Sequence, residues 1–211
     1  MALGNRESAI YLSIRNGKVY RYSKTQQEGT IVITNKNGED RFYFVYDYVD
    51  GIVTSIKTKK DSFAGQEKTF LVVTLTDEGE NFNIEIDIQS NYFQSFANAI
   101  INGDVNQSFK LIPTLKEVDG KKNTGMIIMQ NGQALKWKYT KDAPGDMPNI
   151  VITKNKKGEV VDVDRDERNN FLFTQLDNWL SNAVTGKSTM PQPTALIEDD
   201  SNELDINDLP F

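Results

Sequence analysis

The sequence predicts a mainly β (α+β) fold, and three patterns support that prediction. Short segments of alternating apolar and polar residues recur over roughly the first 140 positions, separated by Asn-Gly and other Gly-containing turns. Helical periodicity is confined to two segments, one around residue 95 and one around residue 175. Two helices are too few to supply the crossovers that a parallel α/β sheet requires. Antiparallel pairing is therefore expected.

The N-terminal part, residues 1–48, reads as hairpins. Segments 9–15 and 18–23 alternate on either side of Asn16-Gly17, a type I′ turn signal. Segments 30–34 and 41–48 form a second pair around the turn at 35–38. The strand at 41–48 carries aromatic residues on both faces, so some of its rings are expected to be exposed.

The central part, residues 49–141, alternates most clearly. Strands are predicted at 52–59, 68–76 and 81–88, with a polar loop at 60–66. A helix follows from Ser90 as N-cap to Asn102, with Gly103 at the C′ position. Further strands are predicted at 108–118, 125–130 and 134–139.

The order of these central elements is three strands, a helix, then two or more strands. A helix between the third and fourth strands is the plan of the OB-fold, a partly open five-stranded barrel that often binds oligonucleotides. Other small α+β domains share this order. We therefore expect an OB-fold-like barrel at 49–141, extended by the N-terminal hairpins.

The C-terminal part divides into an extension at 142–187 and a tail at 188–211. The extension holds a short strand near 150–153 and a helix from about Arg165 to Val184. An apolar stripe on that helix is expected to pack on the barrel. It consists of Leu172, Leu176, Trp179, Leu180 and Ala183. The tail has no periodicity and is acidic, so disorder is expected there, and residues 1–187 form the predicted binding domain.

Composition removes many kinds of chemistry. The 211 residues include no Cys and no His, which excludes disulfides, thiolate nucleophiles, imidazole bases and Cys- or His-based metal sites. A carboxylate pair of the glycoside hydrolase type is an open alternative, but no spacing singles out two acids. We expect a binding protein rather than an enzyme, with no cofactor. The N-terminus resembles neither a signal nor a transit peptide, and no apolar run reaches membrane length, so a cytoplasmic location is expected.

The net charge of −6 is unevenly distributed. Six acidic residues and no basic residue follow Lys187, so residues 1–187 carry 24 acidic and 24 basic residues. A neutral body can present a locally basic groove.

Aromatic residues interleaved with Lys or Arg indicate nucleic-acid binding, because bases stack on rings while cations contact phosphates. Three segments have this pattern, and a predicted turn adds two lysines. The candidates are Arg41 and Tyr43; Lys57, Lys59, Lys60, Phe63 and Lys68; Lys136, Trp137, Lys138 and Tyr139; and Lys121 and Lys122. In the third segment, Trp137 and Tyr139 are equally consistent with the inward face of a core strand.

The last seven residues run Asp205-Ile206-Asn207-Asp208-Leu209-Pro210-Phe211. A partner pocket can take the Phe211 ring while a cation binds its carboxylate, and the acids Asp205 and Asp208 steer the segment to basic partners. This tip resembles that of bacterial single-stranded DNA-binding proteins and the acidic, Phe-terminated tails of phage single-stranded DNA-binding proteins. Leu209 replaces their usual Ile, and Asn207 interrupts the acidic run.

The resemblance to phage-type single-stranded DNA-binding proteins implies sequence-independent binding of single-stranded DNA, with RNA as an alternative, in DNA replication, recombination or repair. It implies recruitment of partner proteins by the tip (Asp205, Asp208, Leu209, Pro210 and Phe211) and, for a phage protein, location in the host cytoplasm. The bacterial family lacks the N-terminal hairpins and C-terminal helix, so a monomer or dimer is expected rather than its tetramer. The alternative is an OB-like protein- or carbohydrate-binding module without nucleic-acid activity.

Overall fold

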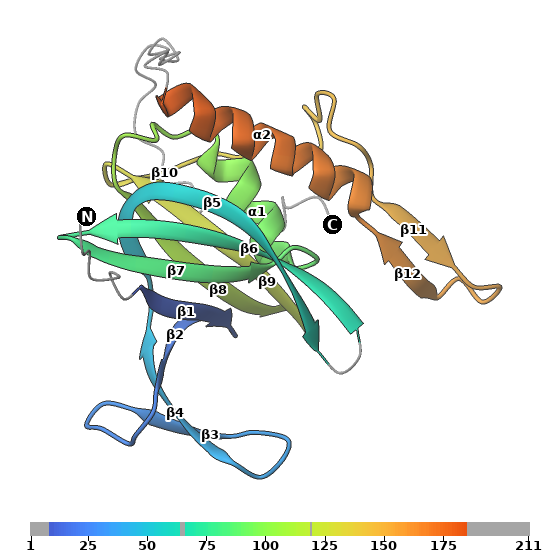
Figure 1. The fold of residues 1–211 in the computed structure, drawn as a ribbon. Coiled ribbons are helices and arrows are strands. Elements are labelled where there is room, and N and C mark those ends of the chain that lie inside the picture. The colour runs from blue at the N-terminus through green and yellow to red at the C-terminus, as the bar shows by residue number, and fades with distance from the viewer. Residues whose placement is uncertain (1–8, 64–65, 119, 185–211) are drawn as a thin grey trace.

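The computed structural model describes residues 9–63, 66–118 and 120–184 (Figure 1). This part is mainly β, as predicted, with one large open sheet, a small two-stranded sheet and two helices. The predicted tail at 188–211 and its tip lie outside the described residues. Neither described helix combines the length and the apolar character needed to cross a membrane.

The N-terminal hairpins form as predicted. Strands β1 (Ile10–Arg15) and β2 (Lys18–Ser23) pair in antiparallel register. Asn16 and Gly17 join them with φ of 47° and 71°, the left-handed pair that a type I′ turn requires. Strands β3 (Ile31–Thr34) and β4 (Asp40–Tyr46) form the second hairpin. Because β4 also pairs with β2, the two hairpins belong to one continuous sheet.

Strands β5 (Val49–Phe63), β6 (Gln66–Asp77) and β7 (Glu80–Asp87) follow. The predicted loop at 60–66 is wrong for most of its length, because β5 and β6 stay paired up to Phe63 and Gln66. Polar composition suggested a loop, but the backbone ladder forms here with few apolar side chains, and the cross-strand ion pairs Lys59–Glu85 and Lys68–Asp87 flank it. We refer to residues 57–63 and 66–70 as the β5–β6 ribbon.

Helix α1 (Asn91–Ile100) begins where predicted, since the Ser90 hydroxyl accepts a hydrogen bond from the Phe93 N–H. The predicted C′ role of Gly103 is wrong, because Gly103 does not adopt the left-handed conformation of that position. A Cβ at Gly103 would lie 2.3 Å from Phe109 Cε1. Glycine is therefore required there by close packing against Phe109.

Strands β8 (Phe109–Val118), β9 (Lys121–Gln130) and β10 (Gln133–Ala134) form the next antiparallel series. The predicted strand at 134–139 is wrong beyond Ala134. The backbone of this segment is bound instead by side chains of α1 and of the turn after it: Asn102 Nδ2 donates to Lys136 O at 2.8 Å, and the Asn98 side chain bonds the backbone of Tyr139. The Leu135 N–H still donates to Ile128 O of β9 at 2.8 Å, and beyond Leu135 the segment runs along α1.

The large sheet has the order β10-β9-β8-β5-β6-β7-β1-β2-β4-β3. Strands β1 and β7 are parallel, and the other neighbours are antiparallel. The N-terminal hairpins thus extend the central sheet at the β7 edge. Their first turn also packs on β8, because a Cβ at Gly17 would lie 2.7 Å from the Leu115 nitrogen.

The C-terminal extension holds β11 (Val151–Lys154), β12 (Val160–Asp164) and α2 (Asp166–Val184). The sequence reading missed β12, which pairs with β11 in a hairpin that projects from the body (Figure 1). The predicted packing of α2 is confirmed: Leu172 and Leu176 are fully buried, and Trp179 and Leu180 pack half-buried on the core. The side chain of Ala183 is outside the described part.

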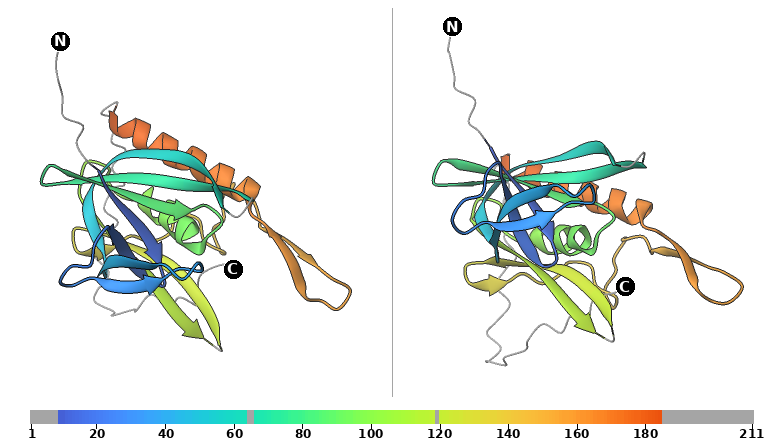
Figure 2. Two further views of the ribbon diagram at one scale, coloured as in Figure 1. Left: turned by 60° about the horizontal axis from the view of Figure 1, so that its bottom comes forward. Right: turned by 90° about the horizontal axis from the view of Figure 1, so that it is seen from below.

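The core lies inside the curve of the sheet. Figure 2 shows α1 seen end-on between β5–β7 on one side and β8–β9 on the other. Its residues Phe93, Phe96, Ala97 and Ile100 have no exposed surface. The opposite face of β5–β7, turned to the viewer in Figure 1, carries no helix.

Candidate nucleic-acid interface

The helix-free side of the sheet is a continuous surface that we call the open face. Directly opposed residues of neighbouring strands share a face, and one row runs Lys57–Val72–Glu85–Ser13–Tyr20 across five strands. The intervening row contains Val73, Ile84 and Leu12, which are buried in the core. The neighbouring outward row contains Ser55, Thr74, Asn83, Tyr11, Tyr22 and Tyr43.

Two exposed tyrosines stand on the open face. Tyr11 on β1 is 63% exposed and Tyr22 on β2 is 55% exposed. Tyr43, only 5% exposed, supports Tyr22 from the adjacent strand in an edge-on contact with ring centroids 5.8 Å apart. Tyr20 packs edge-on against Tyr43 from its other side, at 5.9 Å. The packed pair holds Tyr22 in place while its ring surface remains accessible.

The sequence predicted Tyr43 as the ligand-contacting ring of this region, but its ring is buried. The aromatic pattern of residues 41–48 could not show which rings are exposed, because their exposure depends on the neighbouring strands. Arg41 is exposed on β4, with its guanidinium 3.8 Å from the Glu39 carboxylate. The Arg15 guanidinium lies 5.4 Å from the Tyr43 ring centroid and brings a cation to the open face beside the tyrosines. Tyr11, Tyr22 and Arg15 were missed, although the alternation of both N-terminal strands puts them on one face.

The β5–β6 ribbon carries the predicted lysines, and two of them are ion-paired. Lys59 Nζ lies 2.8 Å from Glu85 and 3.5 Å from Asp61, and Lys68 Nζ lies 3.6 Å from Asp87. The hydrogen bond to Glu85 and the two carboxylate charges raise the pKa of Lys59 above its ordinary value, although burial opposes them. These lysines therefore supply less unbalanced positive charge than the sequence suggested.

Lys57 and Lys60 complete the cationic set of this ribbon. Both are exposed, and within the described ranges no carboxylate lies within 4.0 Å of either ammonium group. Lys57 lies on the open face in register with Val72, and Phe70 is half-buried in the next outward position of β6. Phe63 is in β5, but its side chain is outside the described part.

Lys121 and Lys122 begin β9 and are exposed. They lie at the end of the ribbon formed by β8 and β9, opposite Val118 and Glu117. Figures 1 and 2 show this ribbon and the β5–β6 ribbon projecting from the same end of the molecule. The two predicted lysine groups are therefore at one end, whereas the exposed tyrosines lie on the sheet face nearer the N-terminal hairpins.

The segment Lys136–Tyr139 does not belong to the open face. Trp137 and Tyr139 are half-buried and pack against the core, so the interpretation of these rings as core residues fits the structure. The Tyr139 hydroxyl donates to Gln175 Oε1 at 3.1 Å, and its ring meets Phe171 edge-on at 5.1 Å. Lys136 and Lys138 remain exposed, next to α1.

A polar ladder occupies the centre of the open face. Thr74 Oγ1 donates to Asn83 Oδ1 at 2.8 Å, and Thr76 Oγ1 donates to Asn81 Oδ1 at 2.7 Å. The first bond fixes the Asn83 amide with its oxygen engaged, so its NH₂ is the group left to face a ligand. Sequence reasoning missed this ladder because Thr and Asn on a strand are ordinary solvent-facing residues.

The open face thus combines accessible rings, the amide donor of Asn83 and cations, with a few carboxylates at the root of the β5–β6 ribbon. Rings bind bases by stacking, and lysine and arginine contact phosphates. Among the described residues, no group of three or more acidic side chains is arranged to hold a metal ion. The arrangement suits the non-covalent binding of an extended, anionic, aromatic polymer.

Comparisons with known proteins give no match: none of the protein-family models, curated proteins or solved structures that were searched is similar to this chain.

Proposed function

We propose that this protein binds single-stranded DNA without sequence preference, through the open face and the two lysine-bearing ribbons. The observation that carries the proposal is the exposure of Tyr11 and Tyr22 on one face with Arg15 and Lys57. Every base offers a ring face for stacking, so this chemistry does not select a sequence. Duplex DNA hides those ring faces, which favours single strands.

The strand pairing supports an OB-type origin for the central sheet. Strand β5 pairs with β6 and β8, β6 with β7, and β8 with β9, with α1 between β7 and β8. We infer an OB-like core in which the β1–β2 hairpin occupies the edge of β7 that would otherwise close the barrel. In OB-folds, the second and third strands and the loops after the first and fourth bind oligonucleotides. Here those correspond to the open face, the β5–β6 ribbon and the β8–β9 ribbon.

The acidic C-terminal segment has a separate proposed role. Asp205, Asp208 and Leu209-Pro210-Phe211 recruit replication, recombination or repair proteins, as the resemblance implies, while the body coats the strand. The same polyanion competes weakly with DNA for the cationic ribbons, and salt masks that competition. The proposed activity is stoichiometric binding, with no catalysed reaction.

The test is fluorescence anisotropy of labelled oligo-dT of about 30 nucleotides at two salt concentrations, with duplex DNA, oligo-rU and oligosaccharide as competitors. We expect affinity for oligo-dT to fall steeply with salt and to exceed duplex affinity at least tenfold. A protein lacking residues 198–211 is expected to bind oligo-dT equally or more tightly. Absence of oligo-dT binding at low salt would overturn the proposal. Displacement of bound oligo-dT by the oligosaccharide but not by unlabelled oligo-rU or duplex would favour the carbohydrate-binding alternative.

A further inference from the structure

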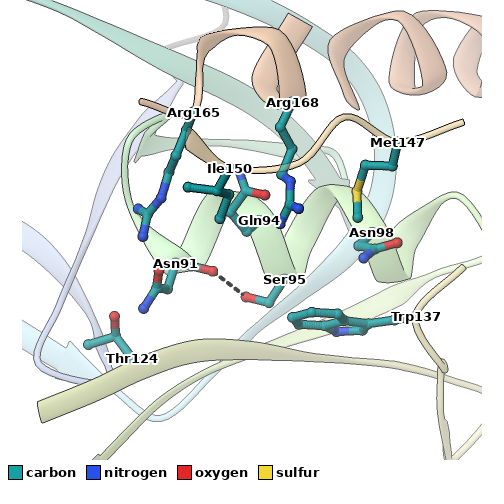
Figure 3. Close-up of a pocket in the computed structure, with 10 residues that line it drawn as sticks. All are labelled: Asn91, Gln94, Ser95, Asn98, Thr124, Trp137, Met147, Ile150, Arg165 and Arg168. Atoms are coloured by element: carbon teal, nitrogen blue, oxygen red, sulfur yellow. Dashed lines mark hydrogen bonds between the residues drawn. The ribbon is translucent and has the colours of Figure 1, made fainter. Parts of the chain in front are cut away.

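Two arginines at the start of α2 point into a small polar pocket above α1 (Figure 3). Arg168 is 9% exposed and Arg165 is half-buried. The pocket has a volume of about 20 Å³, and its polar lining also includes Asn91, Asn98 and Thr124. It lies behind the open face, between α1, α2 and β9.

Neither guanidinium is neutralised. Arg165 Nη1 donates to Gln89 O at 2.5 Å and Arg168 Nε donates to Pro148 O at 2.9 Å, and both acceptors are uncharged carbonyls. Over the described ranges, no carboxylate lies within 4.0 Å of either group, and Arg165 Nε is buried without a hydrogen-bond partner. Burial lowers the pKa of both arginines, and the charge of Arg165 lowers that of Arg168 further.

Two desolvated cations side by side are unfavourable unless an anion joins them. Each guanidinium offers several N–H donors in a fixed plane, and only one donor of each is engaged by the described residues. The Arg168 terminal nitrogens, the Asn91 amide and the Thr124 hydroxyl also border the pocket without a hydrogen bond from the side chain to a described residue. The donor set is therefore cationic, planar and largely unused.

We propose that this pocket binds a phosphate group, with Arg165 and Arg168 as its cationic ligands. Guanidinium groups bind phosphate through paired N–H donors. A volume of about 20 Å³ admits one water-sized atom, so one phosphate oxygen enters while the phosphorus and its other oxygens stay at the mouth. A phosphodiester can also place one oxygen in the pocket while its two ester substituents stay outside the mouth, so it fits as well as free phosphate does.

The pocket lies at the root of the β8–β9 ribbon. Thr124 belongs to β9, three and two residues after Lys121 and Lys122. A nucleic-acid strand that follows those lysines toward α1 brings a backbone phosphate to the arginines. The identification of the bound phosphate as part of a nucleic-acid backbone rests on the proposed function, whereas the phosphate site itself does not.

The site itself is tested with inorganic phosphate on the full chain, by the thermal unfolding midpoint at constant ionic strength. Phosphate at about ten times its dissociation constant is expected to raise the midpoint by about 3 to 6 °C relative to chloride. Arg168→Gln is expected to abolish the shift. Lys154→Gln, which removes one charge from the exposed β11 strand, is the matched control and is expected to retain it. A shift that persists in Arg168→Gln, or no shift in the unmodified protein, overturns the site.

Asn91→Asp keeps the test decisive if Arg168→Gln fails to fold. It places a carboxylate in the pocket with almost no change of shape, so it occupies the arginines and is expected to abolish the phosphate response. Retention of the full response in a folded Asn91→Asp protein overturns the site.

The source of the phosphate is tested with oligo-dT cut to the shortest length that still binds fully, so that it has one register, and carrying one neutral methylphosphonate that is moved along the strand. One position is expected to weaken binding by the unmodified protein several-fold and to have no effect on Arg165→Gln. The double-logarithmic salt slope of Arg165→Gln is expected to be shallower by roughly 0.7. If no position couples to Arg165 while phosphate still stabilises the protein, the site binds free phosphate only. If oligo-dT does not bind at all, the proposed function fails and the phosphate titration still decides the pocket.

Discussion

The N-terminal strand β1 and the segment after β10 both alternate in residue type and both carry aromatic and cationic residues, but their aromatic rings differ in exposure. In β1, Tyr11, Ser13 and Arg15 point away from the core, and nothing described covers Tyr11. In the segment after β10, Trp137 and Tyr139 pack inward, held by Asn98 of α1 and by Phe171 and Gln175 of α2. The alternation of residue types in a strand predicts which side chains lie on the same face. Whether a second layer covers that side depends on elements far away in sequence.

The largest expected effect is on oligo-dT affinity, when the exposed rings of the open face are removed. Replacing both Tyr11 and Tyr22 with Ala removes two stacking surfaces, each contributing about 1–3 kcal/mol per base, so affinity for oligo-dT is expected to fall roughly 30-fold or more. Fluorescence anisotropy measures this. Stability in urea is expected to change little, because both rings are more than half exposed.

The Tyr11→Phe and Tyr22→Phe pair is the matched control, since it keeps the rings and removes only the hydroxyl groups. Its oligo-dT affinity is expected to stay within about threefold of that of the unmodified protein, because the stacking surface is unchanged. Equal losses in the Ala and Phe pairs would mean that stacking on these rings does not drive binding.

The next effect is on stability, and it concerns the segment after β10, whose rings pack on the core. Tyr139→Ala removes a core-packed ring and its hydrogen bond to Gln175, so the free energy of unfolding is expected to fall by about 3 kcal/mol. Urea denaturation followed by Trp fluorescence measures this. Affinity for oligo-dT, measured where the variant is fully folded, is expected to match that of the unmodified protein. A stable variant with weakened DNA binding would reverse the assignment of this segment.

The smallest expected effect concerns the hydrogen bond between α1 and the turn of the N-terminal hairpin, which helps to hold that hairpin on the body. The Tyr92 hydroxyl of α1 accepts a hydrogen bond from the Gly17 N–H at 2.8 Å, at the turn between β1 and β2. Burial raises the pKa of Tyr92 above its ordinary value of 10.0, although the Gly17 bond lowers it. A raised pKa in the folded state stabilises the protein below pH 10 and that contribution is lost as pH rises above it.

Tyr92→Phe is therefore expected to cost about 1 kcal/mol at pH 7 and to flatten the loss of stability that sets in as pH rises above 10.0. Denaturation midpoints across that pH range measure both effects. An unchanged slope above pH 10 would show that other groups control alkaline unfolding.

Local signals in the sequence predicted several elements well. Asn16-Gly17 fixed the first turn, because few other dipeptides adopt two consecutive left-handed conformations. Ser90 marked the start of α1, because its hydroxyl satisfies an N–H that the helix leaves unpaired. The stripe of Leu172 and Leu176 predicted which side of α2 is buried. Each of these depends on residues within about one turn of each other.

Other features depended on distant partners and were missed. The β5–β6 ribbon continues as a paired ladder through a polar segment, and Lys59 at its base is ion-paired with Glu85 on a third strand. Gly103 is required by Phe109, which folds back against it. The lysines of the candidate interface were identified, but the ion pairs that neutralise two of them, and the exposure of Tyr11 and Tyr22, depend on strand order.

The mainly β character, the Asn16-Gly17 turn, the helix starts and the absence of thiol and imidazole chemistry could all be predicted from the residues alone. These follow from short-range sterics, hydrogen bonding and residue type. The pairing of β1 with β7, the exposure of Tyr11 and Tyr22, and the meeting of Arg165 and Arg168 over α1 became visible only in the folded chain. Burial and pairing between remote segments are properties of the whole chain, because each surface is covered or left open by residues that a local pattern does not contain.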